Sequence, residues 1–77
     1  MERKEANYHE NEAKQLTDRE LEVLKHLIMG KTNAQIGQAL GLSAHTIKAH
    51  VGSIMRKMSV EARVQAAVKA IKSGLLK

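Results

Sequence analysis

The chain has 77 residues and no cysteine, and its formal net charge at pH 7 is +5. A chain of this length forms one small domain with a modest core, and without cysteine it has neither disulfides nor thiolate ligands for a metal. Its longest apolar runs are two or three residues. They are too short for a membrane-spanning helix or a signal-peptide core, so we expect a cytoplasmic protein with no membrane partner.

Residues 1–15 are mostly polar and lack apolar periodicity, so we expect an arm or linker there and a folded domain over 16–77. A first helix is predicted at about 18–29, because Thr17 and Glu20 have the spacing of a capping box. The apolar residues of one helical face follow: Leu21, Leu24, Leu27 and Ile28.

A second helix is predicted at 33–40, where Thr32 and Gln35 repeat the capping-box spacing. Gly37 lies inside this helix, where glycine costs about 1 kcal/mol relative to alanine, and we expect it to allow the close approach of another helix. Residues 41–43 leave a turn so short that the next helix must bend away sharply.

A third helix is predicted at about 44–58, with Ser43 as its cap. At about 100° per residue, its apolar side chains form one stripe that we expect to face the core. This stripe contains Ala44, Ile47, Val51, Ile54, Met55 and Met58. Small, polar and basic residues lie opposite: His45, Thr46, Ala49, Gly52, Ser53 and Arg56. The edges carry Lys48, His50 and Lys57.

A fourth helix is predicted at about 61–73 and carries two apolar stripes. One contains Val64, Ala67, Val68 and Ile71, and the other contains Ala62, Ala66 and Ala70. A helix packed on one side needs only one apolar face. The valine stripe therefore either binds a partner or fills the core, while the alanines simply favour helix formation.

Positive charge is concentrated in the middle of the chain. No acidic residue lies between Glu22 and Glu61, whereas five basic residues do: Lys25, Lys31, Lys48, Arg56 and Lys57. Such a block inside a folded domain indicates a polyanionic partner, with a solvated cationic face as the alternative.

We expect no metal site among the histidines, although His9 or His26 could in principle join one of the third-helix histidines across the fold. On the third helix, His45 and His50 are about 140° apart and cannot share a metal as residues spaced by four can. The sequence also lacks a catalytic triad order, a phosphate loop and a carboxylate pair in an apolar setting. We therefore expect no cofactor, no metal and no enzyme activity. A helix with a small and basic outer face instead fits the major groove of DNA.

Five stretches carry a family resemblance: LTDRELEVL, GKTNAQI, LSAHTIKAH, IMRKMSV and RVQA. In this order they resemble the LuxR/FixJ/GerE-type helix-turn-helix domain, which ends many bacterial response regulators. The resemblance covers about residues 16–74. It implies an all-α, four-helix domain that binds promoter DNA with its third helix in the major groove. It also implies a homodimer formed through the fourth helix, and RNA polymerase is a further candidate partner.

Carried over position by position, the resemblance implies a role for each matched residue. Base reading falls to Lys48, Ala49 and Gly52, and the outer-face residues Ser53 and Arg56 are added as candidates. Contacts with the DNA backbone fall to Thr32, Asn33, Thr46, His50 and Lys57. The dimer interface falls to Val64, Val68 and Ile71, and Arg63 is expected to be structural.

The sequence departs from the family pattern at several positions. Gly37 stands where alanine is usual, Ser59 where glycine is usual, and Ala62 where a small polar residue is usual. Gly52 lacks a base-reading side chain, so we expect sequence discrimination that depends more on DNA shape. Two other functions fit the pattern: the promoter-reading domain of a sigma factor, and a helical protein-interaction module that does not bind DNA.

Overall fold

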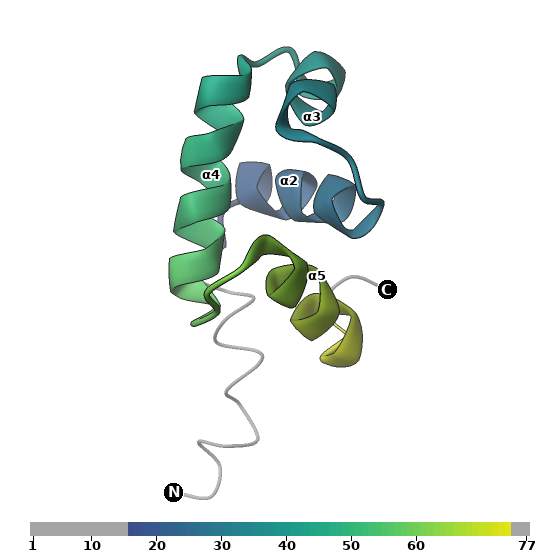
Figure 1. Cartoon of the computed structure of the whole chain (residues 1–77), viewed down its shortest axis with the longest axis vertical. Coiled ribbons are helices and arrows are strands. Elements are labelled where there is room, and N and C mark those ends of the chain that lie inside the picture. Colours follow the sequence, from purple (N-terminus) through teal and green to yellow (C-terminus); the bar gives the residue numbers. More distant parts are fainter. Residues whose placement is uncertain (1–15, 75–77) are drawn as a thin grey trace, which may run out of the picture.

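The computed structural model of the protein describes residues 16–74. These residues form four helices and no strand: α2 (Asp18–Ile28), α3 (Asn33–Leu40), α4 (Ala44–Lys57) and α5 (Arg63–Lys72) (Figure 1). The predicted all-α, four-helix class is confirmed. Within this part of the chain, no helix is long and apolar enough to cross a membrane. The predicted arm at 1–15 and the end of the predicted domain at 75–77 lie outside the described residues.

Two helices begin at the predicted capping boxes. At α2, the Thr17 hydroxyl accepts from the Glu20 backbone N–H, and the Glu20 carboxylate accepts from the Thr17 N–H, both at 3.0 Å. At α3, Thr32 and Gln35 make the same reciprocal pair at 3.1 and 2.9 Å. Each box satisfies two backbone donors that a helix start otherwise leaves without a partner. These local interactions fix where both helices begin.

The turn between α3 and α4 is held by backbone contacts. Gly41 has a φ of 73°, in the left-handed region that favours glycine. The Leu42 N–H donates to the Gly37 carbonyl at 2.8 Å, and a Cβ on Gly37 would overlap the Leu42 carbonyl oxygen. The expectation that Gly37 admits another helix was therefore wrong, because the close neighbour is the turn itself. Ser43 then caps α4 by accepting from the Thr46 N–H at 3.0 Å.

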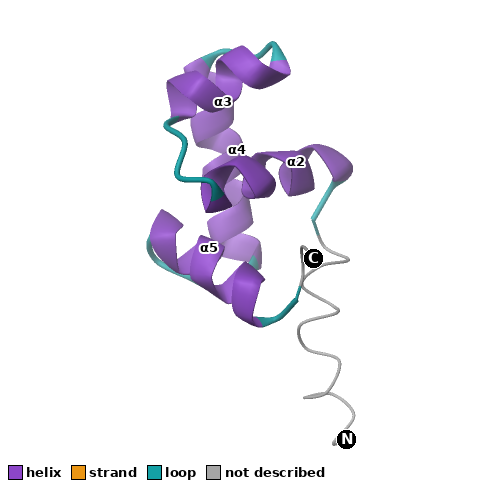
Figure 2. Ribbon diagram, turned by 90° about the vertical axis from the view of Figure 1, so that its right-hand side faces the viewer, coloured by secondary structure: helices purple, strands orange, loops and turns teal. Residues whose placement is uncertain are grey.

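The long helix α4 lies along one side of the molecule, and the other three helices lie along its inner face (Figures 1 and 2). The apolar stripe predicted for α4 faces them: Ile47, Ile54 and Met58 are fully buried and Val51 nearly so. Ala44 was placed on this stripe but is exposed, because the first residue of the helix extends beyond the core. The opposite side of α4 is left uncovered.

The fourth helix begins later than the sequence indicates. The sequence predicts a start near Glu61, but α5 starts at Arg63, with Ala62 extended as the residue before it. Alanine has no side-chain oxygen to cap a helix. Instead, the Gln65 side chain accepts from the N–H groups of Glu61 and Ala62 at 2.8 and 3.0 Å. These two residues therefore belong to the connection. The helices α2, α4 and α5 also end one residue earlier than predicted.

The larger side chains of α5 and its buried alanines have opposite environments. Ala66 and Ala70 are fully buried, and Ala67 of the valine stripe is buried as well, whereas Ala62 is exposed. The three larger side chains of the valine stripe are exposed: Val64 at 65%, Val68 at 45% and Ile71 at 59%. The interpretation in which these residues fill the core is therefore wrong. An apolar face of α5 is left uncovered in the single chain.

Candidate nucleic-acid interface

The outer face of α4 is small and basic, as the sequence indicates. Four of the five predicted base-reading residues are exposed there: Lys48, Ala49, Gly52 and Arg56. Their positions follow from burial of the opposite stripe, because a helix that buries Ile47, Val51 and Ile54 presents the residues about 180° away to solvent. A convex helix face of this kind can enter a groove of a partner.

Gly52 has no packing role within the fold. Outside its own helix and chain neighbours, no atom of the described residues lies within 4 Å of the position that a Cβ would occupy. A glycine here costs about 1 kcal/mol of helix stability relative to alanine. The fold itself therefore gives no reason for the missing side chain, and any benefit has to come from what approaches this surface.

One edge of α4 is bonded to the start of α2 through Glu20. Ser53 donates its hydroxyl proton to Glu20 Oε2 at 2.7 Å, and the Lys57 ammonium donates to Oε1 at 2.8 Å. The same carboxylate accepts the capping bond from Thr17, and Glu20 is only 5% exposed. Ser53 and Lys57, which are predicted to contact DNA, therefore already donate hydrogen bonds to Glu20 within the fold.

The ionisation of Glu20 follows from these partners. Burial raises the pKa of its carboxyl, but the hydrogen bonds from Lys57, the Thr17 N–H and Ser53, together with the lysine charge, lower it by more. The net effect lowers the pKa from 4.5 to about 2. Glu20 is therefore a carboxylate at neutral pH, and the fold places an acid beside the block that lacks acids in sequence.

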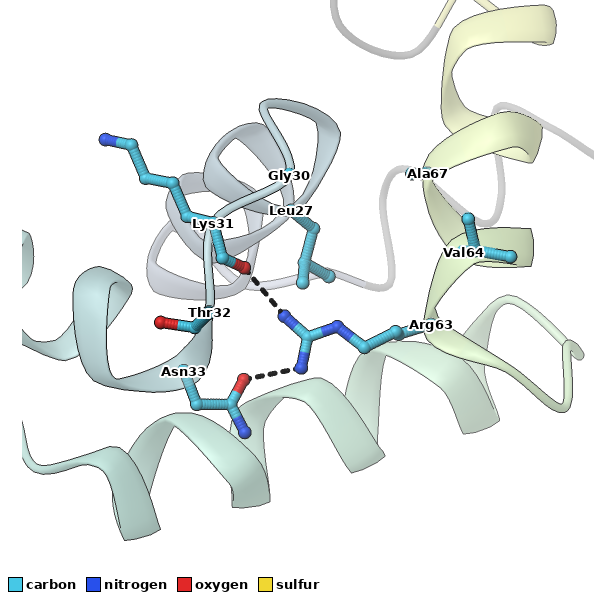
Figure 3. A pocket seen from close by; sticks show the side chains of 8 residues that line it. All are labelled: Leu27, Gly30, Lys31, Thr32, Asn33, Arg63, Val64 and Ala67. Carbon is cyan, nitrogen blue, oxygen red and sulfur yellow. Dashed lines mark hydrogen bonds between the residues drawn. The ribbon is translucent and has the colours of Figure 1, made fainter.

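At the other edge of α4, the start of α3 meets the start of α5. Thr32 is exposed and Asn33 is half-buried. The Arg63 guanidinium donates to Asn33 Oδ1 at 2.7 Å and to the Lys31 carbonyl at 3.0 Å (Figure 3). This agrees with the structural role expected for Arg63, because its side chain joins α5 to the loop before α3.

A surface hollow brings several predicted residues together. It has a volume of about 420 Å³ and lies between α4 and the start of α5. Asn33, a predicted backbone contact, lines it together with Lys48 and Gly52, which are predicted base readers. Arg63 also lines this hollow. The fold thus gathers side chains from three elements beside the outer face of α4.

The remaining predicted contacts lie at the first half of α4. Thr46 and His50 are half-buried. The Thr46 hydroxyl accepts from Ser43 at 2.9 Å, which leaves its own proton available for another acceptor. Among the described residues, no three histidine, aspartate or glutamate side chains gather where they could hold a metal ion.

Three hydrogen bonds at this surface were not predicted from the sequence. Glu20 was identified only as a capping residue, and its bonds to Ser53 and Lys57 span 33 and 37 residues. The bond from Arg63 to Asn33 spans 30 residues. A single sequence carries no periodicity or spacing that pairs such distant positions, so only the packing of the helices reveals them.

The short turn that joins α3 to α4, with the outer face of α4 left uncovered by the other helices, is the arrangement of a helix-turn-helix domain. Comparison with known families agrees: residues 14–70 match the family described as bacterial regulatory proteins, luxR family. The chain belongs to this family. Its members are DNA-binding regulators of transcription, and the expectation that the chain is not an enzyme is confirmed on this ground.

Named relatives give the same result. The chain is 48% identical to the transcriptional regulatory protein DegU of Brevibacillus brevis over 62 residues. The matched region covers 80% of this chain and 26% of the relative. The chain is 44% identical over 61 residues to the transcriptional regulatory protein LiaR of Bacillus subtilis strain 168, covering 79% and 29%. The nitrate/nitrite response regulator protein NarP of Escherichia coli strain K12 is 43% identical over 53 residues, covering 69% and 25%. The chain thus matches less than a third of the length of each of these relatives.

Proposed function

We propose that the chain binds double-stranded promoter DNA with sequence preference, as a bacterial transcription regulator, with α4 in the major groove. The uncovered outer face of α4 carries this proposal. It presents two cations and two small residues, and three helices hold it from behind. The major groove admits a helix and offers base-edge acceptors that suit lysine and arginine. The names of the relatives support a role in transcription, which for a bacterial regulator takes place in the cytoplasm.

Four residues read the bases in this proposal: Lys48, Ala49, Gly52 and Arg56. Backbone contacts come from Thr32, Asn33, Thr46, His50 and Lys57. Ser53 is assigned a different part from the one predicted, because its hydroxyl proton is donated to Glu20. It holds the helix in place and does not read bases. The basic side chains supply the charge attraction that dominates affinity for DNA, and the small residues let the helix approach the base edges.

We further propose that two copies associate through the uncovered face of α5. Val64, Val68 and Ile71 are exposed at helical spacing, and burying them against a second copy removes apolar surface from water. A twofold pair would place two α4 helices on successive half-sites of one duplex. As a transcription regulator, the chain would also have RNA polymerase as a candidate partner.

Binding to random and selected duplexes tests the proposal, because phosphate neutralisation makes affinity fall steeply with salt. Lys48→Ala is expected to change which sequences an in vitro selection recovers, since each good base contact contributes about 1–3 kcal/mol of discrimination. The matched control is Lys25→Ala, which removes the same charge from an exposed position on α2 and should leave the recovered sequences unchanged.

Other results would point to the other functions. A folded chain that shows no affinity for any duplex at low salt would contradict the proposal and favour the protein-interaction module. A complex with one copy on one site would favour the sigma-factor type of promoter reading over the dimer.

A further inference from the structure

The contact between Arg63 and Asn33 determines how one proposed DNA contact is oriented. A guanidinium group has only donors, so the atom of the Asn33 amide that faces it has to be the oxygen. The 2.7 Å bond from Arg63 Nη1 to Asn33 Oδ1 therefore fixes the rotation of the amide. The amide nitrogen is turned away from Arg63 (Figure 3).

The amide nitrogen is left with its two donors unused inside the fold. Among residues 16–74, no hydrogen bond engages Asn33 Nδ2, whereas the oxygen is taken. If the amide were rotated by half a turn, its oxygen would face outward and would repel a phosphate oxygen. An oriented amide thus presents only hydrogen-bond donors, which match an acceptor-only ligand such as a phosphate diester.

Arg63 also holds the loop that carries Asn33. Its second nitrogen donates to the Lys31 carbonyl at 3.0 Å, so one planar side chain fixes both the loop backbone and the amide two residues later. Its own helix packs against α2 and α4, and Ala66 and Ala70 of that helix are fully buried. The guanidinium therefore holds the start of α3 in one position relative to α5.

We propose that Arg63 is a positioning residue for the phosphate contact of Asn33 and acts on DNA affinity through that amide. The proposal rests on the proposed DNA binding and deepens it. It does not require Arg63 to touch the DNA, because its donors are already directed at Asn33 and Lys31.

A double-mutant cycle on DNA affinity tests this. Asn33→Ala and Arg63→Ala are each expected to weaken binding to all duplex sequences by about tenfold per bound domain, the size of a lost hydrogen bond to a charged acceptor. The double variant should also lose only about tenfold. A product of the two losses, about a hundredfold, would overturn the proposal, because Arg63 would then act independently of Asn33.

The salt dependence separates positioning from direct contact. Arg63→Ala should leave the slope of log affinity against log salt unchanged. If the Arg63 charge neutralised a phosphate directly, its loss would make this negative slope shallower by about 0.9. Either a shallower slope or an unchanged affinity overturns the proposal. If Arg63→Ala does not fold, Arg63→Lys serves in the same cycle, because it keeps the charge and loses the two-pronged geometry.

NMR provides a further check. In the original protein, the side-chain amide signals of Asn33 should shift when duplex DNA is added, and in Arg63→Lys this shift should be lost. Failure of the original chain to bind duplex DNA would count against the proposed function as a whole. Binding with independent effects of the two substitutions would count against the positioning role alone.

Discussion

At the scale of a single residue, the Glu20 side chain both caps one helix and joins it to another. Its two carboxylate oxygens accept from Thr17, Ser53 and Lys57, so one buried group both caps α2 and holds one edge of α4. A buried carboxylate is costly unless it is fully hydrogen-bonded. The three donors meet this requirement, and the lowered pKa of Glu20 reflects it.

The stability of the fold should therefore depend on acid pH through Glu20. Its pKa is about 2 in the folded chain against an ordinary value of 4.5, so the unfolded chain takes up the proton first as pH falls. The stabilisation is fully present above pH 4.5 and is lost between pH 4.5 and 2, and the difference amounts to roughly 3 kcal/mol. Denaturant unfolding across this range measures it.

The matched variants are Glu20→Gln and Glu22→Gln. The first should be less stable than the original chain at pH 6, and the difference should shrink as pH approaches 2. Glu22 is an exposed carboxylate on the same helix, with a 3.6 Å ion pair to Arg19, and its replacement should have little effect. A constant difference for Glu20→Gln at all pH values would rule out this titration as the source of the effect.

The same residue marks a limit of prediction from sequence. The spacing of Thr17 and Glu20 was enough to predict the cap, because a capping box is local. The bonds of Glu20 to α4 depend on how helices far apart in sequence pack. For this reason the basic block between Glu22 and Glu61 had no acid in sequence but has one beside it in space.

At the scale of elements, the helices with strong caps were predicted to within one residue. The helices α2, α3 and α4 begin where Thr17, Thr32 and Ser43 indicate. The start of α5 was two residues off, because Ala62 gives no cap signal. Ser59, in the connection before α5, has a φ of 59°, which explains why glycine is usual there. Among the described residues, Ser59 is the one residue other than glycine with a positive φ, so the backbone strain lies in this connection.

Restoring the cap of α5 should stabilise the domain. Ala62→Ser places a hydroxyl where it can accept from the Gln65 N–H, which now donates to the Ala62 carbonyl at 3.0 Å, and completes the reciprocal pair that the Gln65 side chain already half forms. The gain should be about 1 kcal/mol. Thermal unfolding should show it as a midpoint higher by roughly 4–8 °C.

The control for the cap is Ala62→Val, which adds a side chain without an acceptor and should not raise the midpoint. Equal midpoints for the serine variant and the original chain would mean that the Gln65 side chain already supplies the full benefit of capping.

At the scale of the whole molecule, one face of α5 serves folding and the other is the face proposed for association. The buried alanines join α5 to the core, and the exposed valine stripe contributes little to the single chain. A substitution on the stripe should therefore change association without unfolding the domain. Val68 is the best position for such a test, because Val64 lies next to Arg63.

Val68→Asp should abolish the dimer, because it places a charge in a face that would be buried. Sedimentation over a range of concentrations, with and without a duplex that carries two half-sites, measures this. Gln38→Asp introduces the same charge at an exposed position on α3 and should leave the dimer intact. An original chain that stays monomeric under both conditions would contradict the proposed interface.

Much of this molecule could be predicted from the sequence. The periodicity of apolar residues was sufficient to predict the core face of α4 and hence its outer face. The two stripes of α5 could be seen but not assigned, because periodicity does not say which stripe is buried. The orientation of Asn33 and the partners of Ser53 were not predictable, since they depend on contacts across 30 residues or more.

The open surroundings of Gly52 have a consequence for how this surface can change over evolutionary time. A Cβ at position 52 would meet no neighbour within 4 Å, so a side chain could begin there without repacking the core. Most replacements would also raise helix propensity. If α4 binds DNA as proposed, position 52 is therefore a site where one substitution can give a new target preference, with stability preserved or improved.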